Sequence, residues 1–116
     1  YRYFYNLLIK PQEGEAGLYR WEGGSSAEIS ISVPLHMDVF NQLDPLGWNW
    51  FRVTWWSVEG VGIVVRAEAK VGDTWRRLFD DIVTEDMLTD RTYNRIGLAM
   101  WGLPGYIDNI RIYKAV

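Results

Sequence analysis

Residues 48–56 read WNWFRVTWW, and this run of aromatic and branched side chains constrains the fold more than any other part of the chain. Four Trp residues, with one Phe, one Val and one Thr, favour a β-strand, because large rings and branched side chains pack well on a pleated surface. Alternate side chains of a strand point to opposite faces. One face is therefore apolar, and the other mixes rings with polar groups. The apolar face carries Phe51, Val53 and Trp55, and the mixed face carries Trp50, Arg52, Thr54 and Trp56.

Seven further segments have the composition or the alternation of strands, and turn-forming residues separate most of them. These segments are residues 2–10, 16–21, 28–33, 63–71, 74–79, 95–101 and 106–113. Residues 36–40 could form a short helical turn, but Pro34 and Pro45 bracket them, so the segment 34–47 is assigned to a connection; residues 84–88 could form one helical turn capped by Thr84. The predicted inward side chains of the segment 63–71 are Ile63, Val65, Ala67, Ala69 and Val71. Eight strands without a sustained helical period predict an all-β fold, an antiparallel β-sandwich or jelly roll.

Length and charge narrow the class of protein further. With 116 residues, we expect a single β-sandwich domain over residues 1–116, a fragment of a larger protein. The 12 basic and 15 acidic residues give a net charge of -3, which argues against binding to nucleic acid or to an anionic membrane. No apolar run approaches the ~20 residues that a membrane span needs. Since Cys is absent, disulfides and thiolate chemistry are excluded.

Four motifs in the second half of the chain follow one another in a distinctive order: GWNWFRVTW at 47–55, GDTW at 72–75, RIGL at 95–98 and GYIDNIRIY at 105–113. This series resembles the second half of concanavalin A-like jelly rolls, which include laminin G-like and related lectin and glucanase domains. Galactose-binding-like sandwiches end in a similar Asp-bearing strand and are the alternative topology. The resemblance implies a non-catalytic, lectin-like carbohydrate-binding module that is extracellular or on the cell surface. It also implies a polysaccharide or glycan as the partner and further domains in the same protein.

The candidate ligand-binding residues follow from the chemistry of sugars. A pyranose has an apolar C–H face that an indole covers, and its hydroxyls need hydrogen-bonding groups beside the ring. The candidates are Trp50, Arg52 and Trp56 on one strand, Arg66 and Glu68 on the next strand, and Trp21, Trp75 and Trp101 near turns. The competing interpretation places most Trp rings in the core and the arginines in solvent or in cross-strand ion pairs. The chain would then be a structural β-sandwich that makes protein contacts in a surface, adhesin or virion assembly.

Acidic residues give little support for catalysis. The related jelly-roll glycosidases carry carboxylates at alternate positions of one strand, because two of them must flank the glycosidic bond. Here Glu28 is followed by Ser30 and Ser32 at the equivalent positions, so we expect no enzyme activity and no cofactor. Similar sandwiches sometimes hold a structural calcium ion through an Asp in the last strand. Asp108 is therefore the candidate metal ligand, and a bond from Asp108 to nearby backbone is the alternative.

Overall fold

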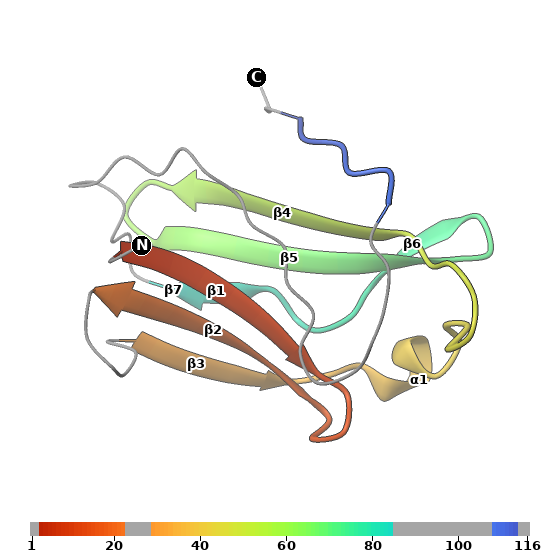
Figure 1. The fold of residues 1–116 in the computed structure, drawn as a ribbon. Coiled ribbons are helices and arrows are strands. Elements are labelled where there is room, and N and C mark those ends of the chain that lie inside the picture. The colour runs from red at the N-terminus through yellow and green to blue at the C-terminus, as the bar shows by residue number, and fades with distance from the viewer. Residues whose placement is uncertain (1–2, 23–28, 85–107, 114–116) are drawn as a thin grey trace.

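The computed structural model describes residues 3–22, 29–84 and 108–113, and these residues form two antiparallel sheets and one short helix (Figure 1). The first sheet contains β1 (Tyr3–Lys10), β2 (Glu15–Glu22) and β3 (Ile29–Pro34), in that order. Gly14 closes the turn between β1 and β2 with a φ of 68°, a conformation that glycine adopts without steric cost. The strands predicted at 2–10, 16–21 and 28–33 are confirmed over the described residues.

The second sheet is built around β5 (Gly62–Val71). One edge of β5 pairs with β4 (Phe51–Val58), and the other edge pairs first with β6 (Thr74–Arg77) and then with β7 (Ile82–Thr84). Gly72 and Asp73 alone connect β5 to β6, and Gly72 has a φ of 60°. Glycine at the first central position is typical of type II′ turns, whose twist matches that of the flanking strands.

The long strand predicted at 48–56 begins later than expected, at Phe51. The preceding loop is held by two hydrogen bonds between the Asn49 side chain and the Asp44 backbone. The Asn49 amide donates to the Asp44 carbonyl oxygen at 2.7 Å, and its Oδ1 accepts from the Asp44 backbone N–H at 3.0 Å. Such local bonds offer the backbone an alternative to a sheet ladder. Trp48 and Asn49 therefore lie in a loop rather than in β4.

A two-residue bulge separates β6 from β7. Glu68 pairs with Arg77 and Val65 pairs with Ile82, so four residues on this edge face two residues of β5. The Leu78 N–H still donates to the Ala67 carbonyl oxygen at 2.9 Å, which leaves Phe79 and Asp80 as the inserted pair. The strand predicted at 74–79 therefore ends at Arg77. Leu78 and Phe79, adjacent in sequence, are both fully buried.

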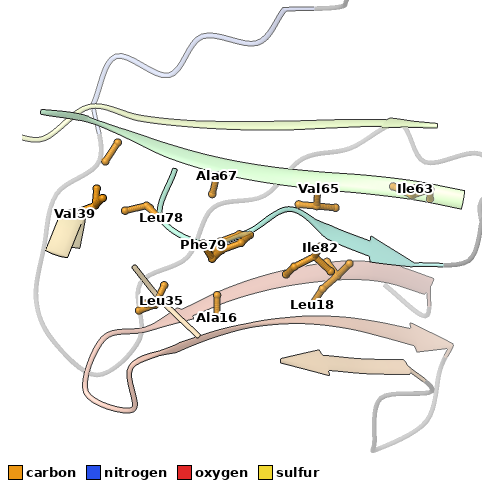
Figure 2. Packing of buried hydrophobic residues seen from close by; sticks show 11 residues of the cluster. Ala16, Leu18, Leu35, Val39, Ile63, Val65, Ala67, Leu78, Phe79 and Ile82 are labelled. Atoms are coloured by element: carbon orange, nitrogen blue, oxygen red, sulfur yellow. The ribbon is translucent and has the colours of Figure 1, made fainter. Parts of the chain in front are cut away.

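Both sheets contribute to the hydrophobic core (Figure 2). Its buried members come from β2, β5, β7, residues 78–79 between β6 and β7, and the segment around α1 (Met37–Phe40): Ala16, Leu18, Leu35, Val39, Ile63, Val65, Ala67, Ala69, Leu78, Phe79 and Ile82. The predicted inward positions of β5 are confirmed, with Val71 partly buried at the end of the strand. The connection after β3 joins the two layers, because Leu35 forms a β-bridge with Phe79 and the His36 N–H donates to the Leu78 carbonyl oxygen at 2.7 Å.

The structure tests three predictions about the second half of the chain to different extents. Thr84, the predicted cap of the helical turn at 84–88, ends β7 and is buried, and the rest of that turn lies outside the described residues. The strand expected at 106–113 is wrong over residues 108–113, which have no regular structure and in which Asn109 adopts a φ of 54°. The strand expected at 95–101 lies outside the described residues. In the described part of the chain, no helix has the length and apolar character that crossing a bilayer requires.

Candidate functional site

The face of the second sheet that points away from the core combines rings with charges. Directly paired residues of an antiparallel sheet lie on the same face, so the pairing register groups these side chains into rows. The Trp50 carbonyl oxygen accepts from the Lys70 N–H at 3.0 Å, which extends the register by one residue beyond β4. We call this surface the aromatic–polar face. Its rows are Trp50, Lys70 and Trp75; then Arg52, Glu68 and Arg77; then Thr54, Arg66 and Asp81; then Trp56, Val64 and Val83.

Arg52 is held in place by groups from β5 and from β6, the strand beyond it. Its Nε donates to Glu68 Oε1 at 3.0 Å, and its Nη2 lies 3.0 Å from the same oxygen. Its guanidinium also lies 4.4 Å from the centre of the Trp75 ring, within the range of a cation–π contact. Arg52 therefore makes the cross-strand ion pair that sequence alone offered as the alternative to ligand binding. The contact leaves the side chain 47% exposed, whereas Glu68 beneath it is 12% exposed.

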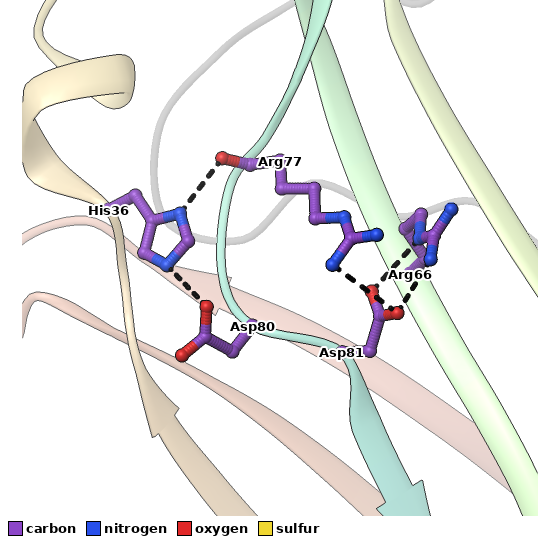
Figure 3. A network of polar contacts seen from close by, with 5 residues as sticks. All are labelled: His36, Arg66, Arg77, Asp80 and Asp81. Carbon is purple, nitrogen blue, oxygen red and sulfur yellow. Dashed lines mark hydrogen bonds and ion pairs between the residues drawn. The ribbon is translucent and has the colours of Figure 1, made fainter.

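Arg66 forms the most complete ion pair on this face, with Asp81 (Figure 3). Arg66 Nε donates to Asp81 Oδ1 at 3.0 Å and Nη2 donates to Oδ2 at 2.7 Å, a bidentate geometry that suits a guanidinium and a carboxylate. The hydrogen bonds from Arg66 lower the pKa of Asp81, and the charge of Arg77 acts in the same direction. The same bonds raise the pKa of Arg66. The guanidinium of Arg66 also lies 5.1 Å from the Trp56 ring centre.

His36 fixes the bulge that places Asp81 opposite Arg66. One ring nitrogen, Nδ1, lies 3.2 Å from the Arg77 carbonyl oxygen, and Nε2 lies 3.0 Å from Asp80 Oδ1 (Figure 3). These contacts tie the end of β6 at Arg77 and the inserted residue Asp80 to the connection that follows β3. His36 therefore has a structural position next to the aromatic–polar face rather than a place on it.

Six predicted site residues come together on the aromatic–polar face: Trp50, Arg52, Trp56, Arg66, Glu68 and Trp75. The Trp50 side chain is 48% exposed, and Trp56 is half-buried beside Arg66. Sequence reasoning did not assign Lys70, Arg77 or Asp81 to the site. The two-residue turn at 72–73 sets the pairing of β5 with β6. It could therefore have predicted that Lys70 and Arg77 lie on the same face as Trp75. No local pattern predicts that Asp81 lies on this face, because the bulge shifts the pairing register by two residues.

The remaining predicted site residues do not join this face. Trp21 alternates along β2 with the buried residues Leu18 and Arg20, so it lies on the outer face of the first sheet, on the other side of the core. Trp101 lies outside the described residues. Asp108 is exposed, and its Oδ1 accepts a hydrogen bond from the Asn109 N–H at 2.8 Å, which is the backbone contact offered as the alternative to a metal. Within the described ranges, no three His, Asp or Glu side chains are grouped to hold a metal ion.

The inner face of β4 is a second surface with unusual exposure. Phe51, Val53 and Trp55 pair with Ala69, Ala67 and Val65, so they point to the same side of the sheet as the core. Nevertheless they are 52%, 45% and 51% exposed. None of them belongs to the core cluster formed by the described residues. We call these three residues the inner row of β4. Half-exposed apolar side chains in a row are a feature of surfaces that meet a partner.

These observations define an all-β protein of two antiparallel sheets that share a core, with one open sheet face that combines indole rings and ion pairs. No protein-family model, curated protein or solved structure matches the chain. Its function must therefore be argued from the geometry of its own side chains.

Proposed function

We propose that this chain is a non-catalytic carbohydrate-binding module that holds a polysaccharide or glycan on the aromatic–polar face. The observation that carries the proposal is an exposed series formed by Trp50, just before β4, and by Arg52 and Thr54 on β4. A half-exposed indole can cover the C–H face of a pyranose, and the guanidinium and hydroxyl beside it can bond to sugar hydroxyls. By strand rise, Trp50 and Trp56 lie about 20 Å apart, which accommodates several sugar units.

Ion pairs order the arginine side chains of this face before a ligand binds. Arg52 is held by Glu68 and by the Trp75 ring, and Arg66 is held by Asp81. Ordered side chains lose less conformational entropy on binding than free ones, which favours affinity. The same contacts cover one face of the Trp56 and Trp75 rings with guanidinium groups. Trp50 is therefore the main stacking platform of the proposal, and Trp56 is a secondary contact at the far end.

The proposal includes the setting of the domain. The fold would be a concanavalin A-like jelly roll, with a galactose-binding-like sandwich as the alternative topology. The module would be one domain appended to others in an extracellular or cell-surface protein, which it tethers to a glycan. Because the proposed contacts use side chains alone, no cofactor takes part in binding.

The test compares two tryptophans on the same strand region. Trp50 and Trp55 have nearly equal exposure, 48% and 51%, but they point to opposite faces of the sheet. In a glycan array and in affinity gel electrophoresis, we expect Trp50→Ala to lose binding while Trp55→Ala retains it. Circular dichroism of both variants checks that they fold. Equal binding by wild type and Trp50→Ala, or loss in Trp55→Ala alone, would contradict the proposal.

The inner row of β4 favours a second candidate function, a structural β-sandwich that makes protein contacts in a surface, adhesin or virion assembly. Phe51, Val53 and Trp55 would be covered by a neighbouring domain or subunit. Replacing Val53 with Lys would place a charge in such an interface, where an unpaired buried charge is costly. Val53→Lys should then abolish assembly with the parent protein's other domains or subunits, measured by sedimentation, and leave glycan binding intact.

A further inference from the structure

The aromatic–polar face carries more positive than negative charge, although the whole chain has a net charge of -3. Its rows contain four cations and two carboxylates, which makes a local excess of two positive charges. The cations are Arg52, Arg66, Lys70 and Arg77, and the carboxylates are Glu68 and Asp81. The sign of the face is therefore opposite to that of the protein as a whole.

The cations are also the groups that a ligand would meet first. The side chains of Arg52 and Arg77 are each 47% exposed, and Lys70 is exposed at the end of the face. In contrast, the side chains of Glu68 and Asp81 are only 12% and 18% exposed. The carboxylates thus order the arginines from below, and a molecule approaching the sheet faces mainly guanidinium and ammonium groups.

Arg77 keeps most of its hydrogen-bonding capacity. Asp81 is already held by both bonds from Arg66, and the Arg77 Nη1 lies 3.6 Å from Asp81 Oδ2, beyond the length of a hydrogen bond. A guanidinium has five N–H donors in a planar fork that fits a carboxylate or sulfate. Arg52 and Arg77 flank Glu68 on opposite neighbouring strands, about 10 Å apart by strand spacing. Two anionic groups of one ligand could therefore be bound side by side.

Acidic side chains in the hairpin turns do not cancel this pattern at contact range. Asp73 is four residues from Arg77 along β6, about 14 Å by strand rise, and this exceeds the Debye length of about 8 Å at physiological salt. Glu59 lies in the turn at the other end of β4 and β5. Bonds to an anionic group in the middle of the face therefore depend mainly on Arg52 and Arg77, while Lys70 lies at the end of the face beside the turn at 72–73.

We propose that the glycan held by the aromatic–polar face is an acidic polysaccharide, whose uronate carboxylates bind Arg52, Arg77 and Lys70 while its sugar rings contact Trp50 and Trp56. This inference rests on the proposed carbohydrate-binding function and specifies its ligand class. Three exposed cations are far fewer than the extended basic footprint of a nucleic-acid-binding surface, so a polynucleotide is the less favoured anion.

The experiment uses a matched pair of ligands and a matched pair of variants. The ligands are polygalacturonate and its fully methyl-esterified form, which have the same sugar backbone but differ in that the ester carries methyl groups in place of the negative charges. The variants are Arg77→Gln and Arg76→Gln. These two arginines are neighbours on β6 and point to opposite faces of the sheet. Each has one guanidinium nitrogen 3.6 Å from a carboxylate oxygen, that of Asp81 for Arg77 and that of Asp38 for Arg76. By calorimetry, we expect Arg77→Gln to weaken polygalacturonate binding about tenfold or more, because bonds to charged groups are strong. Arg76→Gln should bind like the wild type.

Salt provides a readout that needs no substitution and stands even if a variant fails to fold. Raising the ionic strength from about 0.1 M to about 1 M shortens the Debye length from about 10 Å to about 3 Å, and polygalacturonate binding should weaken accordingly. Equal binding of the acid and the ester by the wild type would overturn the acidic ligand class and leave the glycan-binding function standing. Binding of neither, with no other glycan bound, would remove both proposals. Equal affinity for a polynucleotide or for phosphatidylserine vesicles would also overturn the inference, since the face would then recognise charge alone.

Discussion

Replacing Phe79 with Ala tests whether the core is arranged as the bulge requires. Phe79 is fully buried between the sheets, although it lies in a two-residue insertion between β6 and β7 (Figure 2). Burying a Phe side chain stabilises a protein by about 1.5–3 kcal/mol, and the cavity left after truncation adds to the loss. We therefore expect Phe79→Ala to lower the free energy of unfolding by about 3–5 kcal/mol.

The matched control is Phe51→Ala, on the inner row of β4. Phe51 is 52% exposed, so its truncation loses only about half of the transfer free energy of a buried Phe and leaves no closed cavity. The expected loss is about 1 kcal/mol. For a chain of 116 residues, the unfolding entropy is about 0.24 kcal/mol/K, so 1 kcal/mol corresponds to about 4 °C in melting temperature. Phe79→Ala should then melt about 12–20 °C below the wild type, and Phe51→Ala about 4 °C below it.

Differential scanning calorimetry and urea titration measure both variants. Phe79→Leu, which keeps most of the buried volume, should cost less than about 1.5 kcal/mol and separates the loss of volume from a general loss of folding. A loss below about 1 kcal/mol for Phe79→Ala would refute the assignment of the bulge to the core. An equal loss for Phe51→Ala would show that the inner row of β4 is covered in the folded chain, and the second candidate function would lose its structural basis.

Two further predictions concern the polar network and a turn. Asp81→Asn should destabilise the protein at pH 7, because Arg66 loses its charged partner. The pKa of Asp81 is lowered from 3.8 in the folded state, so the stability advantage of the wild type should disappear as the pH falls through that lowered value. Urea titration at a series of pH values measures this loss. A difference between the two proteins that persists in strong acid would contradict this role for Asp81. Gly72→Ala should cost about 1 kcal/mol or more in thermal unfolding, because its φ of 60° strains a residue with a Cβ, whereas the neighbouring Asp73→Ala should be nearly neutral. Equal effects of the two substitutions would refute the turn assignment.

Local patterns were sufficient to predict which side chains share a face. A strand alternates with period two whatever surrounds it, so the separation of Trp50, Arg52 and Trp56 from Phe51 and Trp55 followed from the order of residues alone. The turn at 72–73 was equally readable, because Gly followed by a polar residue favours a two-residue hairpin. Most strands of the first 77 residues were therefore placed to within one to three residues of their observed ends.

Patterns failed where contacts between distant residues compete with local preference. The segment 108–113 alternates like a strand, yet a strand also needs a neighbour with which to pair, and no partner is paired with it among the described residues. The residues Ile82–Thr84 were assigned no strand, yet they pair with the middle of β5. Three residues are too few to carry a pattern, and their strand conformation depends on β5.

The candidate site likewise depends partly on local sequence pattern and partly on contacts between distant residues. The membership of Arg52, Arg66 and Glu68 in one face is a consequence of alternation and of the hairpin that joins their strands. The position of Asp81 opposite Arg66 depends on a bulge that His36 holds from 44 residues away, and no local signal encodes that contact. Whether a face is open or covered depends on where the other sheet lies. This is why the side chains of β5 that point inward are buried, while those of its neighbour β4 are half exposed.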